Sequence, residues 1–155
     1  GPMIGIYAKL PARSHGRPTD MLRRLAPASV SSVPQRYAGI FAHGTVLEAP
    51  ARLVFLAGQI GVDANGETKT GFVEQTNQAM DNVEALLIEA DLDRDSMLRV
   101  VYYITDPDNL QALSDLRQER WNSTAAPAVT TLVVAALAAP DLLVEIEVTA
   151  GSNRS

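Results

Sequence analysis

The stretch VFLAGQIGVDANGE, residues 54–67, does most to decide the fold of this chain. Its apolar first half ends at the GQI of residues 58–60 and predicts a short strand. The NG pair at residues 65–66 predicts a tight turn, because both residues tolerate positive φ. Together with the PA pair at residues 127–128 and the apolar run 142–148, the stretch indicates a small-molecule site built where strands end.

Length, charge and cysteine content narrow the class of protein. At 155 residues the chain is long enough for one domain with its own hydrophobic core. A net charge of −5 and a pI of about 4.9 give no field that attracts nucleic acid. The lack of cysteine excludes disulfides and thiolate chemistry. No apolar run approaches the ~20 residues that cross a bilayer, and no charged-then-apolar leader is present, so a cytoplasmic protein without nucleic-acid or membrane partners is expected.

The N-terminal part has a composition of its own. Residues 3–36 hold four prolines and five arginines, which is typical of an arm rather than of a core. We therefore expect an arm at residues 1–36, in which residues 1–2 are a tag remnant and residues 21–25 form one short helical turn. The acidity of the rest of the chain favours a solvated arm over a nucleic-acid contact. The compact domain is expected at residues 37–150, with a C-terminal tail at 151–155.

Hydrophobic periodicity predicts two helices among several strands. Apolar residues recur every three or four positions from residue 72 to residue 90, and Asp106 can cap a second helix at about residues 107–121. The expected strands lie at residues 40–47, 52–57, 98–105, 130–135 and 142–150. This order fits an α+β fold with a mixed sheet and both helices on one face. The other sheet face would be exposed and apolar in a monomer, so self-association through the sheet is expected.

From about residue 41 to residue 150 the sequence resembles the Rid/YjgF (reactive intermediate deaminase) family. The matching motifs are GQI at 58–60, NG at 65–66, Gln75 with Asn82-Val83, Tyr103 with Thr105-Asp106, PA at 127–128 and VEIE at 144–147. The resemblance implies a chorismate-mutase-like fold and a homotrimer whose sheets form a central barrel, with sites at the subunit clefts. It also implies hydrolysis of 2-aminoacrylate-type enamines or imines to 2-keto acids and ammonia, without a cofactor.

The sequence departs from the family pattern at Val129, directly after the PA pair. The family's activity relies on an arginine at this position, whose planar guanidinium clamps the substrate carboxylate through two hydrogen bonds. Valine supplies neither charge nor donor, so the chain resembles a divergent branch that keeps the scaffold and lacks the clamp. A larger or less charged ligand is expected, held by apolar contact with Phe41 and Val129.

The resemblance assigns the catalytic residues. Glu145 matches the family's acid and would orient or activate the attacking water, whereas strand alternation alone makes it a solvent-facing charge beside Glu147. His43 can serve as acid, base or donor, although a lone histidine in a strand is more often structural. The two histidines lie far apart in sequence, and the chain has neither a cysteine nor an HxxxH motif, so no metal site is predicted.

Further residues complete the predicted ligand site. Gly58 and Gln59 end a strand where the backbone approaches a neighbour or simply turns. Thr130 and Thr131 offer hydroxyls, although one of the pair is expected to face the core. We hypothesise that Arg117 replaces the missing arginine by reaching an inter-subunit cleft, the alternative being an arginine on a solvated helix face.

Three functions fit this sequence. The first is a hydrolase or deaminase that acts on an enamine, imine or related intermediate. The second is a pathway-specific enzyme of other chemistry on the same scaffold. The third is a non-catalytic ligand-binding or chaperone-like trimer. The family's link to RNA cleavage receives little weight, because the chain is acidic and lacks a basic, aromatic stripe.

Overall fold

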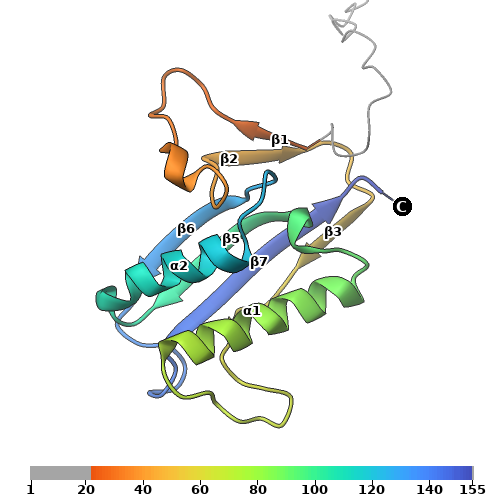
Figure 1. The fold of residues 1–155 in the computed structure, drawn as a ribbon. Coiled ribbons are helices and arrows are strands. Elements are labelled where there is room, and N and C mark those ends of the chain that lie inside the picture. The colour runs from red at the N-terminus through yellow and green to blue at the C-terminus, as the bar shows by residue number, and fades with distance from the viewer. Residues whose placement is uncertain (1–21, 155) are drawn as a thin grey trace, which may run out of the picture.

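A computed structural model describes residues 22–154 (Figure 1). Its strands are β1 Leu22–Leu25, β2 Gly44–Leu47, β3 Arg52–Phe55, β4 Gln59–Ile60, β5 Met97–Ile104, β6 Ala128–Val133 and β7 Val144–Ser152. Its helices are α1 Phe72–Glu89 and α2 Leu110–Arg120, with short 3-10 helices η2 Gln35–Tyr37, η3 Arg94–Ser96 and η4 Pro107–Asn109. The first two strands form a separate antiparallel pair, and the others form one five-stranded sheet.

The main sheet is built around β7. Its strand order is β3-β7-β5-β6, and the short β4 also pairs with β7. The β5–β6 pair is parallel and the other pairs are antiparallel, so the sheet is mixed, as predicted. Figure 1 shows both helices across the same face of this sheet, which confirms the α+β prediction. The sheet of a single chain is open, with β3 and β6 at its edges.

The hydrophobic core lies between the helices and the sheet. Apolar residues at helical spacing on α1 are buried, namely Phe72, Ala79, Met80, Val83 and Leu87. They belong to one cluster with alternate residues of β5 and β7, namely Val100, Tyr102, Ile104, Val144, Ile146 and Val148. The alternate residues in between therefore point to the opposite sheet face.

The predicted turns and caps are also present. Gly66 has φ of 79°, and its N–H donates to the Asp63 carbonyl at 2.9 Å, so the NG pair forms the expected turn. The Asp106 side chain accepts from the Asp108 N–H at 2.9 Å and caps η4, which leads directly into α2.

Predictions for the N-terminal half were partly wrong. The short helical turn is instead β1, because its backbone pairs with β2 in register from Leu22 opposite Leu47. Residues 1–21 of the expected arm lie outside the described residues. The strand expected at residues 40–47 begins only at Gly44, since the Ile40 and Phe41 N–H groups donate to the Tyr37 carbonyl and form a turn. This strand also pairs with β1 rather than with the main sheet.

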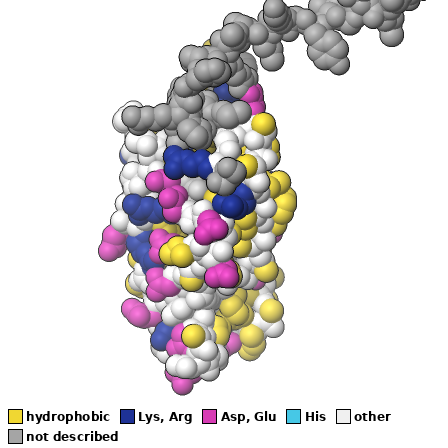
Figure 2. Space-filling model, turned by 90° about the vertical axis from the view of Figure 1, so that its right-hand side faces the viewer, with side chains coloured by type: hydrophobic (Ala, Val, Ile, Leu, Met, Phe, Trp, Pro, Cys, Tyr) yellow, Lys and Arg dark blue, Asp and Glu magenta, His cyan; other side chains and the backbone are white. Residues whose placement is uncertain are grey.

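The sheet face opposite the helices carries exposed apolar side chains. Phe55 is 74% exposed, Leu53 49% and Leu132 44%, and their pairing places all three on this face. Figure 2 shows hydrophobic side chains gathered along its right-hand edge, with charged side chains concentrated on the opposite side. A single chain therefore presents the apolar face that the sequence predicts.

Candidate functional site

Glu145 is the second residue of β7 and lies on the sheet face away from the helices, since Val144 and Ile146 are buried in the core. The side chain is half-buried, and its backbone neighbours in the sheet are Ile60 on one side and Tyr103 on the other. Within residues 22–154 its carboxylate has no hydrogen-bond or ion-pair partner. A half-buried carboxylate without a protein partner is free to hold a water molecule or a ligand.

Gly58 supports the close-approach interpretation rather than the turn interpretation. A Cβ on Gly58 would lie 2.5 Å from Oε1 of Glu145, which is far inside van der Waals contact. The absence of a side chain therefore leaves room for the Glu145 carboxylate beside the end of β4. The adjacent Gln59 pairs with Ile146, and its side-chain amide donates to the Ala57 carbonyl at 3.0 Å.

If Glu145 is catalytic, as the resemblance predicts, replacing Gly58 by alanine is expected to slow turnover by about 10- to 100-fold, because a displacement of a catalytic group by about 1 Å has effects of this size. The new methyl group would push the Glu145 carboxylate aside while leaving the core untouched. Steady-state kinetics together with thermal unfolding would measure both effects. In a Glu145→Gln background the same change should cause no further loss, since the displaced group is already inactive. Equal losses in both backgrounds would contradict the proposed contact.

A second group of site residues surrounds the start of β6. The Ala42 N–H donates to the Pro127 carbonyl at 2.8 Å, and Ala42 also forms a parallel bridge with Ala128. This contact brings Phe41 and His43 alongside the PA pair. The Phe41 and His43 rings meet edge to face, with their centroids 6.0 Å apart.

His43 is exposed, and its Nε2 lies 2.6 Å from the Ser31 carbonyl oxygen. Because a carbonyl only accepts, Nε2 carries a proton, and in the neutral ring Nδ1 is left as an acceptor. The bond to Ser31 holds the ring in place, which fits either a structural or an acid–base role.

The Arg117 side chain extends from α2 to the backbone of the segment that carries Phe41. Its guanidinium carbon lies 4.9 Å from the centroid of the Tyr102 ring, and Nη2 donates to the Ile40 carbonyl at 3.2 Å. Burial raises the pKa of the Tyr102 hydroxyl, and the charge of Arg117 opposes this shift. The Arg117 Nε is buried and has no hydrogen-bond partner among the described residues. Arg117 is therefore not on a solvated helix face.

The register of β6 places Val129 and the two threonines. Val129 is opposite Val100 and Thr131 is opposite Tyr102, so both lie on the helix-covered face. Thr130 is opposite Val101, is exposed and lies on the other face. The expectation that one of the two threonines faces the core side is thus met by Thr131. Val129 packs against the core cluster. The position at which the resemblance predicts a substrate-binding arginine is therefore occupied by an apolar side chain in an apolar environment.

A single chain does not bring these residues together. Gly58, Gln59 and Glu145 lie at β4 and the start of β7, whereas the β6 residues lie on the other side of β5, with Phe41 and His43 beside them. Arg117 lies over the β5 residue Tyr102. Glu145 and Val129 are also on opposite faces of the sheet. Within one chain the sheet therefore separates the Glu145 carboxylate from Val129, whereas Thr130 shares the outer face with Glu145.

Sequence reasoning missed the pairing of Tyr103 with Glu147. The Tyr103 hydroxyl donates to Glu147 Oε1 at 2.8 Å, and this hydrogen bond raises the pKa of Tyr103. Both residues share the outer sheet face with Glu145, as strand alternation along β5 and β7 indicates. The alternation of residues along each strand indicates which side chains share a face. It cannot show that Tyr103 lies near Glu147, because that depends on the pairing of β5 with β7.

Gln75 is a second residue whose role the sequence concealed. It is 2% exposed, and its amide nitrogen donates to the carbonyls of Lys69 and Asp141. Its amide oxygen accepts from the Leu143 N–H at 2.8 Å. Gln75 thus fixes the loop that leads into β7 and to Glu145. The sequence does contain one indication of this role, because Gln75 is a polar residue on the otherwise apolar face of the helix at residues 72–90.

Residues 22–154 contain neither a metal-binding cluster nor a helix suited to span a membrane. No group of three or more histidine, cysteine, aspartate or glutamate side chains is arranged to hold a metal ion there. In the same residues neither α1 nor α2 combines the length and hydropathy of a membrane-spanning helix.

Comparison with known proteins agrees with this architecture. A sequence profile described as "Endoribonuclease L-PSP" matches residues 36–152. A "RutC family protein" of Aquifex aeolicus is 35% identical over 99 residues, which are 63% of this chain and 78% of that protein. The crystal structure of YyfB from Yersinia pestis, described as a protein of unknown function of the Rid family, is 28% identical with a TM-score of 0.71, covering 84% of this chain and 98% of that one.

RidA from an Antarctic Psychrobacter shares the fold, with 24% identity and a TM-score of 0.61 over 81% of this chain and 93% of that one. The mixed sheet with two helices on one face places the chain in the α+β class and is similar to these structures of the Rid family. The chain belongs to the Rid/YjgF family, whose profile spans the sheet and both helices.

Proposed function

We propose that this protein is an enamine or imine hydrolase of the deaminase type, with its site at the clefts between subunits. The observation that carries the proposal is the Glu145 carboxylate, which is half-buried, lacks a partner in residues 22–154 and lies against the backbone of Gly58. A positioned carboxylate of this kind can take a proton from water and return it to a leaving group. Membership of the Rid/YjgF family supports the same class of reaction.

In the proposed reaction an enamine first gains a proton at carbon and becomes an iminium ion. Water oriented by Glu145 attacks the imine carbon, and Glu145 accepts the water proton. The nitrogen of the resulting carbinolamine takes the proton that Glu145 holds. The carbon–nitrogen bond then breaks, the hydroxyl proton passes to the Glu145 carboxylate, and ammonia leaves. The products are a carbonyl compound and ammonia, with no oxidant or reductant consumed. His43 assists through Nδ1, which is free when the ring is neutral.

The proposed ligand-binding residues on or near the helix-covered side of β6 are Phe41, Arg117, Val129 and Thr131, whereas Thr130 lies on the outer face with Glu145. Phe41 and Val129 give the ligand an apolar wall. Arg117 meets an anionic group of the ligand, and its buried Nε without a described partner supports this role. Loss of one charge-assisted clamp removes roughly 1.5–3 kcal/mol of binding. The substrate is therefore larger or less polar than 2-aminoacrylate-sized molecules, since apolar burial must replace that contribution.

The site requires more than one copy of the chain. The separation of Glu145 from the β6 residue group supports shared clefts. The exposed Phe55, Leu53 and Leu132 support burial of the outer sheet face against other copies. We therefore propose a homotrimer in which three sheets form a central barrel.

Ammonia release and molecular mass together test this proposal. Light scattering should give three times the 16.6 kDa mass of one chain. Ammonia should be released from freshly generated imines faster than in the buffer blank, and faster from imines with bulky apolar side chains than from that of 2-aminoacrylate. A single-chain mass, or rates equal to the blank for every imine tried, would contradict it.

The valine at position 129 favours a second candidate function, in which the cleft does not hydrolyse imines. Without a charged clamp, the cleft can bind a ligand and lack chemistry, as a non-catalytic binding or chaperone-like trimer or as a scaffold for other chemistry. Saturable ligand binding without ammonia release would support this candidate. Ribonuclease activity, which the family description names, has little support from a chain with a net charge of −5.

A further inference from the structure

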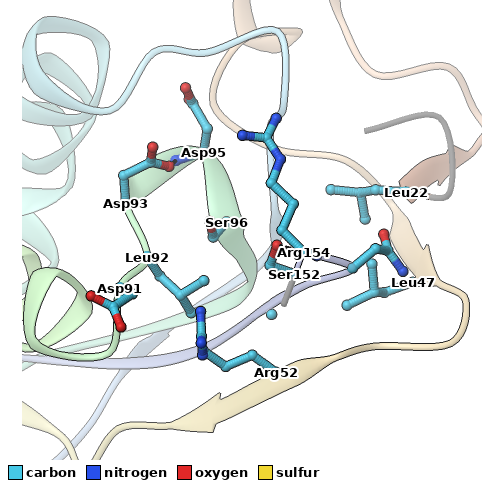
Figure 3. A pocket seen from close by; sticks show the side chains of 12 residues that line it. Leu22, Leu47, Arg52, Asp91, Leu92, Asp93, Asp95, Ser96, Ser152 and Arg154 are labelled. Carbon is cyan, nitrogen blue, oxygen red and sulfur yellow. Dashed lines mark hydrogen bonds between the residues drawn. The ribbon is translucent and has the colours of Figure 1, made fainter. Parts of the chain in front are cut away.

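A large cavity lies away from the proposed site, at the other end of β7. Its volume is about 510 Å³, and it is bounded by the β1–β2 pair, the end of β7 and the turn that follows α1 (Figure 3). Glu145 is at the start of β7, whereas Ser152 at the strand's end lines this cavity. The cavity is therefore separate from the cleft that the proposed function uses.

The walls of the cavity differ in character. Leu22, Leu47 and Leu92 give it apolar surface. Asp91, Asp93 and Asp95 lie on one side, as Figure 3 shows, with Leu92 beside Asp91 and with Arg154 between Asp95 and Leu22. None of the three aspartates forms an ion pair with a described residue. An apolar floor with an acidic wall fits a chain segment that carries both apolar and basic side chains.

The three aspartates are not equally free. The Asp93 carboxylate accepts from the Asp95 N–H, and the Asp95 carboxylate accepts from the Ser123 hydroxyl. The Asp91 carboxylate has no partner among the described residues, and Asp91 has φ of 57°. Asp91 is therefore the acidic group that is most available to a basic partner.

We propose that the cavity is the docking site of residues 3–21 of the same chain. Leu22, the first described residue, lines the cavity, so this segment joins the fold at the cavity wall. The segment contains Lys9, Arg13 and Arg17 against one acidic residue, Asp20. Its basic side chains pair with the aspartate wall, and its apolar residues cover the leucine floor.

Chain length permits this docking within one copy. At roughly 3.3 Å per extended residue, Arg17 can reach about 17 Å from Leu22 and Arg13 about 30 Å. Both distances are sufficient to cross a cavity of this size. A short tether also gives the segment a high effective concentration at its own cavity, which favours the same copy over a neighbour.

Paramagnetic relaxation enhancement tests the docking in the full chain. Because the chain has no cysteine, a Ser14→Cys variant takes a spin label at one position. Amide signals of Asp93, Ser96 and Ser152 should broaden strongly, while that of Asn65, in the turn after β4, serves as the remote reference. Broadening at the cavity no greater than at Asn65 would overturn the proposal.

Matched variants separate charge pairing from chance proximity. Asp91→Asn, which keeps a residue tolerant of positive φ, should reduce the enhancement about two-fold or more, as should raised salt. Glu89→Gln removes a nearby exposed charge that does not line the cavity and should leave the enhancement unchanged. Equal effects of the two variants would contradict pairing with the aspartate wall.

A mixed sample distinguishes the copy that supplies the segment. Spin-labelled chains without ¹⁵N are refolded together with ¹⁵N-labelled chains that carry no spin label. The cavity signals should then remain sharp, because each segment occupies its own cavity. Broadening in the mixed sample equal to that in the uniform sample would overturn docking within one chain.

Discussion

Replacing Glu145 by glutamine is expected to lower imine hydrolysis by about 10²- to 10⁴-fold, the usual contribution of a positioned general base. Glutamine keeps the size of the side chain and its fit beside Gly58, but its amide cannot accept the water proton. The loss should appear in kcat, since the reaction step depends on the carboxylate, while KM changes little. Ammonia release under saturating substrate measures it.

The matched control is Glu147→Gln on the same strand and the same sheet face. Glu147 accepts a hydrogen bond from the Tyr103 hydroxyl, and a glutamine oxygen can accept the same bond. This variant should keep most of the wild-type rate, and both variants should keep the wild-type mass and unfolding temperature. Equal rates for the Glu145 variant and the wild type would remove the central support of the hydrolase proposal.

The elements that were predicted correctly have a strong local pattern. Residues 72–90 repeat apolar side chains at helical spacing, and α1 follows with its apolar residues in the core. Residues 98–105 are rich in β-branched and aromatic side chains, and β5 occupies nearly the same range. In both cases the local preference and the packing partner agree, so a single sequence was sufficient.

The elements that were missed depend on distant partners. The LRRL of β1 has no strand pattern of its own, and it becomes a strand only because β2 pairs with it. The same limit applies to the site. The contact between Gly58 and Glu145 arises from the pairing of β4 with β7, whose register no local pattern encodes.

Arg117 illustrates how packing decides between two interpretations of one residue. Its position on the second helix was compatible with a solvated charge or with a ligand contact. The guanidinium is held over the Tyr102 ring and bound to the Ile40 carbonyl, which excludes the solvated charge and leaves the ligand contact as a proposal. Helical spacing could not predict this, because tertiary contacts bring the segment that supplies Ile40 to α2, among them the bridge of Ala42 to Ala128 and the bond from Gln118 to the Arg36 carbonyl.

Replacing Gln75 by leucine is expected to lower the free energy of unfolding by about 3 kcal/mol, since three half-buried hydrogen bonds are lost and each contributes roughly 1 kcal/mol. The leucine fills a similar volume, so the loss comes from the polar groups rather than from a cavity. The carbonyls of Lys69 and Asp141 and the N–H of Leu143 all lose a partner. Urea unfolding measures the change as a lower midpoint.

The control for this change is Gln111→Leu on α2, where an exposed glutamine donates to Asp115 at 2.9 Å. Its effect should stay within about 0.5 kcal/mol, because water replaces the lost partner at a surface site. All proteins must be compared at one concentration, since association adds to the apparent stability. Because the Gln75 bond to Leu143 holds the entry to β7, the Gln75 variant should also lose turnover while it is still folded. Unchanged stability would show that the loop before Glu145 is held by other contacts.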